Sequence, residues 1–225
     1  DSIFDTLSSI RQAHGGSDAL LILVVNGAED ASQAVHDANL GLLNQARSRG
    51  GIHSAPIGMG SLDGLDLLLI DRASAGHRLP ARQGVGLARK IAADTGLALY
   101  NRGDISSPWL LCTDADVIVP TDYFTALPPP DTSLSAALFP FQHTLEGDAV
   151  QQSAMLSYES YLHYYMLGLH WAGSPYATQT IGSVFAIHAE HYAAVRGFPK
   201  RMAGEDFYLL NKLAKVAPVL PLRSS

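Results

Sequence analysis

Two acidic residues, Asp114 and Asp116, follow the apolar run 109–112 with one residue between them. Packing gives no reason to end a buried strand in two carboxylates, which would repel each other and raise each other's pKa. A hard divalent cation such as Mg²⁺ or Mn²⁺ removes this cost and leaves coordination positions for substrate phosphates. The spacing therefore favours a metal site for a phosphorylated ligand. The alternative is that one aspartate caps a turn and the other is solvated.

A second acidic pair, Glu205 and Asp206, opens an amphipathic segment over 205–216. Acids in the first turn of a helix interact favourably with the helix dipole, which is a sufficient structural explanation. Lys200 and Arg201 lie just upstream, in a loop that could cover an anion. If the first acidic pair holds a metal, an acid in this second pair is a candidate general base.

Apolar runs and helical spacing outline the elements that must position these acids. Strands are expected at 19–27, 65–71, 109–116, 133–142 and 182–190, and helices at 4–13, 31–48, 84–100, 150–170, 191–198 and 205–216. Gly96 is a candidate end point for the third helix. Strands that alternate with helices predict an α/β fold with a mostly parallel sheet. In such sheets ligands bind at the carboxyl ends of the strands, where Asp114 and Asp116 are expected.

Composition narrows the class of protein. The chain has 225 residues, of which 47% are hydrophobic, and a net charge of −6, so a single domain is expected and no basic surface indicates nucleic-acid binding. No apolar run approaches the ~18 residues of a membrane span. The single cysteine, Cys112, cannot form an internal disulfide, which fits a reducing compartment.

The segment 150–170 is the clearest helix and is rich in aromatic residues. Tyr158, Tyr161, Tyr164 and Tyr165 lie close together on it. Aromatic side chains can stack on sugar rings, but an aromatic stripe at helical spacing more often belongs to the core. Both interpretations are open from the sequence.

Four segments occur in an order that is typical of one enzyme family. They are "ILVVNGAEDAS" (22–32), "GVGLARKIA" (84–92), "LLCTDAD" (110–116) and "GSVFAIHAEHYAAVRGFPKRMAGEDFYLLNKL" (182–213). Together they resemble the inverting, metal-dependent glycosyltransferases of family 2, which have the GT-A nucleotide-sugar-binding fold. The chain departs from the family pattern at Ala28, Lys90 and Arg196, where Ser, Asn and Gly are common.

The resemblance implies a Rossmann-like three-layer α/β/α sandwich, with a nucleotide-binding half at 1–125 and an acceptor-binding, catalytic-base half at 126–225. It implies Mn²⁺ or Mg²⁺ as the cofactor and a nucleotide-sugar donor, most commonly a UDP-sugar. The acceptor would be a saccharide, a lipid-linked molecule or a small molecule, and the enzyme would be cytoplasmic, either free or at the membrane periphery. Nucleic acid and a membrane-spanning segment are not expected.

The resemblance also assigns roles to residues of this chain. Asp116 would bind the metal, with Asp114 on the metal or ribose side of the nucleotide. The nucleotide would further contact Asn26, Asp30 and Arg89. Asp206 would be the general base and Glu205 would support it or contact the acceptor. Outside the family context, Asp30 could simply cap the following helix, and Arg89 could be an ordinary solvated charge.

Compared with the family, the first helix comes unusually early. An initial strand that contributes nucleotide contacts is therefore expected upstream of residue 1, and a further portion after "VLPLRSS". Alternatively, "LILVVNG" is itself the first strand. The region 33–64 is longer than the usual link and is a candidate insertion.

Other functions remain compatible with the sequence. Haloacid-dehalogenase-like phosphatases also carry D-x-D after a buried strand, although that strand normally opens their domain. A nucleotidyltransferase with a related sheet and a non-catalytic nucleotide- or sugar-binding domain are further alternatives. Retaining glycosyltransferases share the D-x-D motif, so inversion depends on the role of Asp206.

Overall fold

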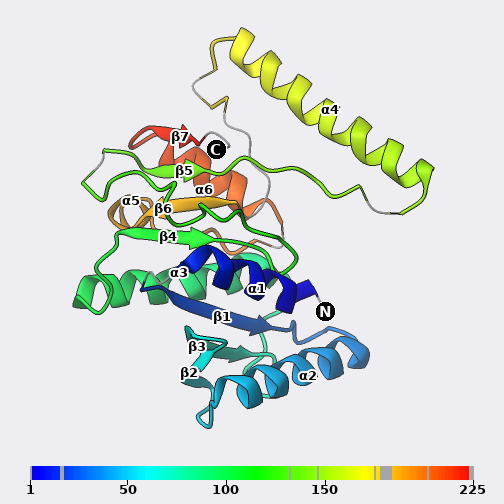
Figure 1. Cartoon of the computed structure of the whole chain (residues 1–225), viewed down its shortest axis with the longest axis vertical. Coiled ribbons are helices and arrows are strands. Elements are labelled where there is room, and N and C mark those ends of the chain that lie inside the picture. The colour runs from blue at the N-terminus through cyan, green and yellow to red at the C-terminus, as the bar shows by residue number, and fades with distance from the viewer. Residues whose placement is uncertain are drawn as a thin grey trace.

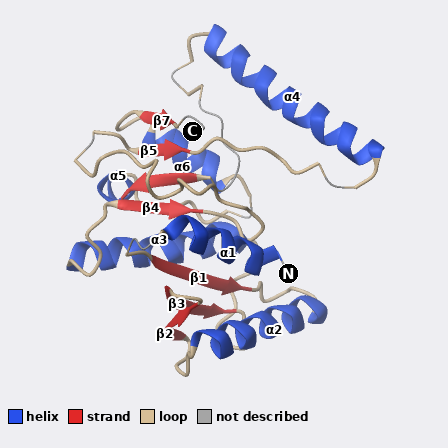
Figure 2. Ribbon diagram, in the orientation of Figure 1, coloured by secondary structure: helices blue, strands red, loops and turns tan. Residues whose placement is uncertain are grey.

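The computed structural model describes residues 2–15, 18–131, 133–145, 147–174, 176–177, 184–201 and 203–222. These residues form a mixed α/β protein with two neighbouring β-sheets and helices around them (Figures 1 and 2). The α/β class is as predicted from the sequence.

The first sheet has the strand order β1-β3-β2. Its strands are β1 (Leu20–Asn26), β2 (Ile57–Leu62) and β3 (Leu65–Arg72). β1 and β3 are parallel, as expected for two apolar runs whose connection includes a helix. β2 and β3 form an antiparallel hairpin that turns at Asp63 and Gly64, both with positive φ.

Strand β2 was not predicted, because its sequence has little strand character. Its glycines bring it close to the end of helix α2 (Gln33–Gly50). A Cβ on Gly60 would lie 2.1 Å from the carbonyl oxygen of Gly50, and one on Gly58 would lie 2.3 Å from the side chain of Ile52. The glycines are therefore explained by close backbone approach.

The second sheet has the order β4-β6-β5-β7. Its strands are β4 (Trp109–Cys112), β5 (Ala136–Leu138), β6 (Phe185–His188) and β7 (Val219–Pro221). β6 is antiparallel to both β4 and β5, whereas β5 and β7 are parallel. Gly182 and Ser183, which belong to the strand expected at 182–190, lie outside the described residues.

The prediction of a mostly parallel sheet is not confirmed, because both sheets are mixed. Three of the five pairings between described strands are antiparallel. One is the pairing of β2 with β3 in the unpredicted hairpin. The other two are the pairings of β6 with β4 and with β5, because β6 runs in the opposite direction to both. Apolar runs indicate that a strand is buried, but they do not give its direction.

Helices cover both faces of the sheets. They are α1 (Ser2–His14), α3 (Gly84–Arg102), α5 (Ala189–Ala194) and α6 (Glu205–Leu213), in addition to α2. Alternate residues of β6 belong to different core clusters: Phe185 and Ile187 pack with Ala93 of α3, and Ala186 packs with Ile10 of α1. Because alternate strand residues point to opposite faces, α1 and α3 lie on opposite sides of the second sheet.

Helix α3 does not end at Gly96, which sequence analysis had considered as its end. It continues to Arg102 and is capped by Gly103 in the left-handed conformation. A Cβ on Gly96 would lie 2.9 Å from the side chain of Leu110 and 3.6 Å from that of Ile22. The glycine therefore lets α3 approach β4 and β1 closely.

Helix α4 (Ala149–Trp171) lies apart from the two sheets (Figure 1). None of its described side chains is buried, and Tyr164 and Trp171 are 77% and 95% exposed. The interpretation of its tyrosines as core residues is therefore wrong for this structure. The Glu159 carboxylate links the helix to the preceding loop by accepting hydrogen bonds from the backbone and ring of His143, at 2.8 and 2.9 Å.

Among the described residues, no helix combines the length and apolarity needed to cross a bilayer.

Asp71 anchors the end of β3 and is almost fully buried. Its carboxylate accepts hydrogen bonds from the backbone N–H groups of Ala73 and Ser74 and from the Ser74 hydroxyl, and it pairs with Arg47 of α2 at 2.8 Å. Burial by itself raises the pKa of Asp71, but these hydrogen bonds outweigh it and hold the pKa below its ordinary value. An ionised Asp71 therefore stabilises the folded state.

We expect Asp71→Asn to lower the free energy of unfolding at pH 7 by about 2–3 kcal/mol, since it weakens a buried ion pair and the hydrogen bonds from Ala73 and Ser74. The stabilisation from ionised Asp71 is present above the ordinary aspartate pKa and is lost as pH falls through the lowered folded pKa. The difference between wild type and variant should therefore shrink below about pH 4, as measured by urea unfolding at a series of pH values. Asp66→Asn, at an exposed position of the same strand, is the matched control. An equal effect of both substitutions would contradict this role.

Candidate functional site

The two aspartates of the D-x-D motif lie directly after β4. The strand ends at Cys112, and Ala115 and Asp116 form a turn. The Asp114 side chain is partly buried and Asp116 is exposed. The predicted strand over 109–116 is thus shorter than expected, and the acids belong to the loop at its carboxyl end.

Arg89 connects this loop to the second acidic motif. It lies in the second turn of α3, and its guanidinium pairs through Nη2 with Asp114. Its Nε lies 3.1 Å from Oε1 of Glu205, the first residue of α6. One arginine therefore joins two acidic motifs that are ninety-one residues apart, 114 to 205, in the sequence. The prediction that Arg89 contacts nucleotide stays untested; among the described residues, its partners include the carboxylates of Asp114 and Glu205.

Glu205 and Asp206 are both buried, at 3% and 9% exposure. Burial raises the pKa of Glu205, and Arg89 acts in the opposite direction; the charges of Asp206 and Asp114 raise it further. Glu205 is thus an ion-paired acid with a defined partner. Asp206 receives no hydrogen bond on its carboxylate from the residues that the structure describes. Of the two acids, Glu205 has an ion-pair partner, and Asp206 has none among the residues that the structure describes.

The loop before α6 docks on the start of α3 through Gly86. Its N–H donates to the carbonyl oxygen of Arg201 at 3.1 Å. A Cβ at this position would lie only 2.4 Å from the same oxygen and 2.8 Å from that of Pro199. Sequence analysis did not single out Gly86, although a glycine inside a helical pattern often marks close packing. This contact fixes the start of α6 beside Arg89.

A second contact fixes the other side of the same loop. Arg196 and Gly197 both adopt positive φ in the turn after α5. The ammonium of Lys212, on α6, donates to the carbonyl oxygens of Val195 and Gly197 at 2.8 and 3.1 Å. Arg201 is exposed and stacks over the ring of Tyr208 at 3.8 Å, and Lys200 is also exposed. The position of α6 therefore rests on backbone contacts at both ends of the loop.

Asn26 and Asp30 occupy different surroundings. Asn26, at the end of β1, lines the same cavity of about 620 Å³ as Arg89 and Asp114. Asp30 is exposed and is not among the described residues that line it. It does not cap α2 either, since Ser32 is the N-cap and accepts from the N–H of Val35. The structure thus brings together Asn26, Arg89 and Asp114, and leaves Asp30 and Asp116 in exposed loops.

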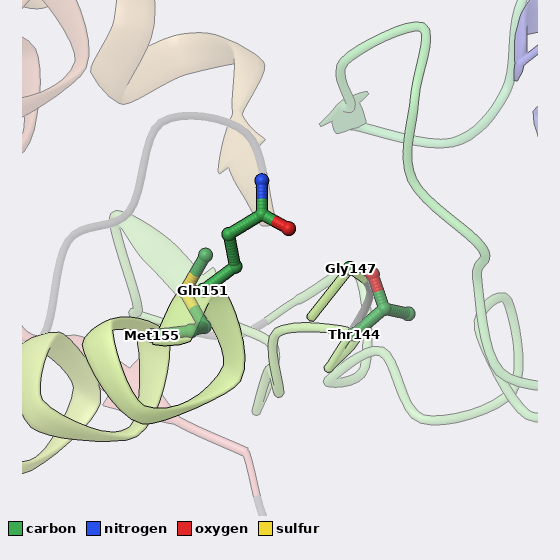
Figure 3. Close-up of a pocket in the computed structure, with 4 residues that line it drawn as sticks. All are labelled: Thr144, Gly147, Gln151 and Met155. Carbon is green, nitrogen blue, oxygen red and sulfur yellow. The ribbon is translucent and has the colours of Figure 1, made fainter. Parts of the chain in front are cut away.

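Another hollow lies at the start of α4 (Figure 3). It is lined by Thr144, Gly147, Gln151 and Met155, none of which has an acidic or basic side chain. The Gln151 side chain accepts from the N–H of Asp148 in a capping box. This hollow therefore reflects the geometry of a helix start, and none of its described lining side chains is suited to catalysis.

The D-x-D loop offers two carboxylates as candidate ligands for a metal ion. Among the described residues there is no group of three or more His, Cys, Asp or Glu side chains that could hold a metal ion. Two carboxylates nevertheless fit a hard cation that takes its other ligands from a diphosphate and water. Asp116 is exposed and could serve directly, whereas Asp114 already pairs with Arg89.

Comparisons of the chain with protein-family models, with curated proteins and with solved structures found no match.

We expect Arg89→Met to lower the free energy of unfolding at pH 7 by about 2–3 kcal/mol, because it leaves the buried Glu205 carboxylate without its cation. Without Arg89 the pKa of Glu205 rises further. The loss of unfolding free energy should therefore become smaller as the pH falls and Glu205 is protonated, and larger as the pH rises. Urea unfolding at several pH values measures this.

Two further variants test whether the loss of stability in Arg89→Met comes from the unpaired Glu205 carboxylate. Glu205→Gln in the Arg89→Met background should recover part of the loss, because a neutral amide does not need a counter-ion. Arg102→Met removes an exposed arginine that pairs with Asp104 and should change stability by less than about 0.5 kcal/mol. If Arg89→Met lowers the free energy of unfolding equally at all pH values, and Glu205→Gln recovers none of this loss, then Arg89 does not stabilise the fold through its ion pair with Glu205.

Proposed function

We propose that this protein is an inverting glycosyltransferase of the GT-A type, which transfers a sugar from a nucleotide-sugar donor to an acceptor hydroxyl. The observation that carries the proposal is the link from Asp114 through Arg89 to Glu205. It brings the D-x-D loop and the start of α6, which carries Glu205 and Asp206, to the same end of β4. The four sequence segments that resemble family 2 supply these same residues.

Asp206 is the proposed general base. It is buried, and its carboxylate has no hydrogen-bond partner among the described residues, so it is free to accept a proton from an acceptor hydroxyl. As the proton moves to Asp206, the acceptor oxygen attacks the anomeric carbon. The bond from that carbon to the phosphate oxygen breaks, and its electron pair leaves with the nucleoside diphosphate. One displacement inverts the anomeric centre and needs no covalent nucleophile.

Glu205 and Arg89 act as positioning residues in this scheme. The ion pair fixes the first turn of α6, and with it the direction of the neighbouring Asp206. Arg89 also holds Asp114, so the distance between the base and the D-x-D loop is set through one side chain. Geometry of this kind contributes to catalysis by orienting the reacting groups.

Asp116, with Asp114 beside it, would hold Mn²⁺ or Mg²⁺ together with the donor diphosphate. When bound, the cation would neutralise the charge that develops on the leaving diphosphate. Asn26 at the end of β1 lines the same cavity and would contact the nucleotide. UDP is the proposed nucleotide, and the acceptor is a saccharide, a lipid-linked molecule or a small molecule with a free hydroxyl.

We expect Asp206→Asn to lower the rate of sugar transfer by about 10²–10⁴-fold, the usual contribution of a general base, with nucleotide affinity nearly unchanged. Sugar transfer, or slow hydrolysis of the donor, is measured as the release of nucleotide from UDP-sugars in the presence of Mn²⁺. Nucleotide affinity is measured by calorimetry with UDP. Glu190→Gln, in the first turn of α5, is the control for removing a helix-start acid and should keep full activity. A large loss of UDP affinity in Asp206→Asn would assign this residue to binding, and hydrolysis of simple phosphate esters by the wild type would favour the phosphatase alternative.

We expect Asp116→Asn to raise the Mn²⁺ concentration needed for half-maximal UDP binding by about tenfold or more, because it removes the exposed carboxylate ligand. Titration of Mn²⁺ at fixed UDP measures the change. Asp131→Asn, at an exposed acid in the loop before β5, should leave the titration as in the wild type. If UDP binds equally well to Asp116→Asn and does not depend on Mn²⁺ in either protein, the metal assignment is wrong.

A further inference from the structure

Helix α4 has two opposite faces that differ in exposure. One face is partly covered, and the preceding loop attaches to it through the hydrogen bonds between His143 and Glu159. The residues of this face are Gln152, Met155, Glu159, Leu162, Met166 and Leu169. Every residue of the other face is exposed, and at 100° per residue this face lies on the opposite side of the helix. We call it the open stripe; it consists of Val150, Ala154, Ser157, Tyr161, Tyr164, Gly168 and Trp171.

The open stripe has the chemistry of a protein interface. None of its seven side chains is charged, and residues 149–171 contain one acid, Glu159, and no lysine or arginine. Aromatic residues are enriched in the buried centre of protein interfaces, whereas charged residues are depleted there. The rings of Tyr161 and Tyr165 are already stacked, with centroids 6.5 Å apart. Less side-chain freedom is therefore lost when a partner covers them.

The exposed area of this face is large enough for a stable contact. Tyr161, Tyr164 and Trp171 lie on the open stripe, and Tyr158 and Tyr165 flank it. These five side chains are between 48% and 95% exposed. Since a whole aromatic side chain can bury ~150–250 Å², their exposed parts amount to roughly 500–800 Å² on one copy. A stable interface buries about 800 Å² on each partner.

The order of large and small residues makes the open stripe complementary to itself. Two copies of α4 can be placed antiparallel, with the two-fold axis at the middle of the helix. Tyr164 of each copy then lies opposite Tyr161 of the other, and Trp171 of each lies opposite Ala154 of the other. The largest side chain thus meets a small one near the helix ends. Mutual pairing of this kind is what a two-fold contact between identical chains requires.

Gly168 supports the same register independently. Glycine is unfavourable inside a helix, and where it occurs it usually has a packing or functional reason. A Cβ on Gly168 would meet no atom of the described chain within 4 Å, so contacts within one copy do not supply that reason. In the antiparallel pair Gly168 lies opposite Ser157, and two small residues let the helix backbones approach closely.

A membrane surface suits α4 less well than a protein partner does. Helices that lie on membranes carry lysine and arginine on a polar face opposite their apolar face. α4 has neither residue type, and the face opposite the open stripe includes Met155, Leu162, Met166 and Leu169. Within the described chain, no helix is long and apolar enough to cross a bilayer.

We propose that α4 is a dimerisation element, and that two copies of this chain associate through the open stripes of their α4 helices, packed antiparallel about a two-fold axis. α4 lies apart from the two sheets (Figure 1), and none of the candidate-site residues belongs to it. The proposal is therefore independent of the proposed transferase activity.

The first experiment measures the molecular mass as a function of concentration by analytical ultracentrifugation. We expect the wild-type chain to form a reversible dimer, and Tyr161→Glu/Tyr164→Glu to raise its dissociation constant at least about hundredfold, since both tyrosines lie at the centre of the contact. Both side chains are exposed in one copy, so the variant should keep the wild-type circular dichroism spectrum. Ile57→Glu/Met59→Glu is the matched control, because it adds the same charges at two exposed apolar residues of β2, and it should dimerise as the wild type does.

The second experiment tests the antiparallel register and leaves the aromatic residues intact. Ser157→Cys and Gly168→Cys are made separately in a Cys112→Ser background, which removes the native thiol. A short thiol crosslinker should join chains in the mixture at least about tenfold faster than in either variant alone. The reason is that positions 157 and 168 face each other between copies, whereas identical positions are separated by about 16 Å along the helix axis.

Four outcomes would overturn the proposal. The wild-type chain stays monomeric at its highest soluble concentration. The dimer survives Tyr161→Glu/Tyr164→Glu, or the β2 control dissociates it equally. Each cysteine variant alone is crosslinked as fast as the mixture, which excludes the antiparallel register. A monomeric wild type binds phosphatidylcholine–phosphatidylglycerol vesicles and the tyrosine variant does not, which would assign the open stripe to a membrane surface.

Discussion

The ion pairs of Arg89 are the interaction on which the candidate site depends. The guanidinium holds Asp114, which follows β4, and Glu205, which begins α6. Glu205 is buried, and a buried carboxylate without a cation would be strongly unfavourable. The folded chain therefore keeps α3, the D-x-D loop and α6 in one arrangement. The start of α6 also sets the position of the Asp206 carboxylate, which has no hydrogen-bond partner among the described residues.

The backbone around this ion pair is built to allow it. Gly86 lets the loop before α6 lie directly on α3, because any larger residue would collide with the Arg201 carbonyl group. Gly96 lets the same helix approach β1 and β4. Helix α3 thus contacts both sheets and also carries Arg89, so that packing and site geometry depend on one element. The cavity of about 620 Å³ that residues of β1 and β4 line is also lined by Arg89 of this helix.

Much of the element order could be predicted from the sequence, since long apolar runs and helical spacing are strong local signals. β2 could not, because its glycines serve a close approach to α2 that depends on tertiary packing. Strand direction was not predictable for a related reason: burial makes a strand apolar whether its neighbours are parallel or antiparallel. The acids of the site were identified from the sequence, but their link through Arg89 was not. That link depends on how α6 docks, and no local pattern encodes it.

The central claim is that the D-x-D loop and the start of α6 form one site for a nucleotide diphosphate and its acceptor. A crystal structure with UDP and Mn²⁺ tests it most directly. We expect anomalous density for manganese at direct coordination distance from an Asp116 oxygen, with diphosphate oxygens completing the coordination and Arg89 still paired with Glu205. The Asp206 carboxylate should face the far end of the diphosphate across open space. Manganese or UDP bound away from the D-x-D loop, or an Asp206 carboxylate turned away from the bound diphosphate, would contradict the account.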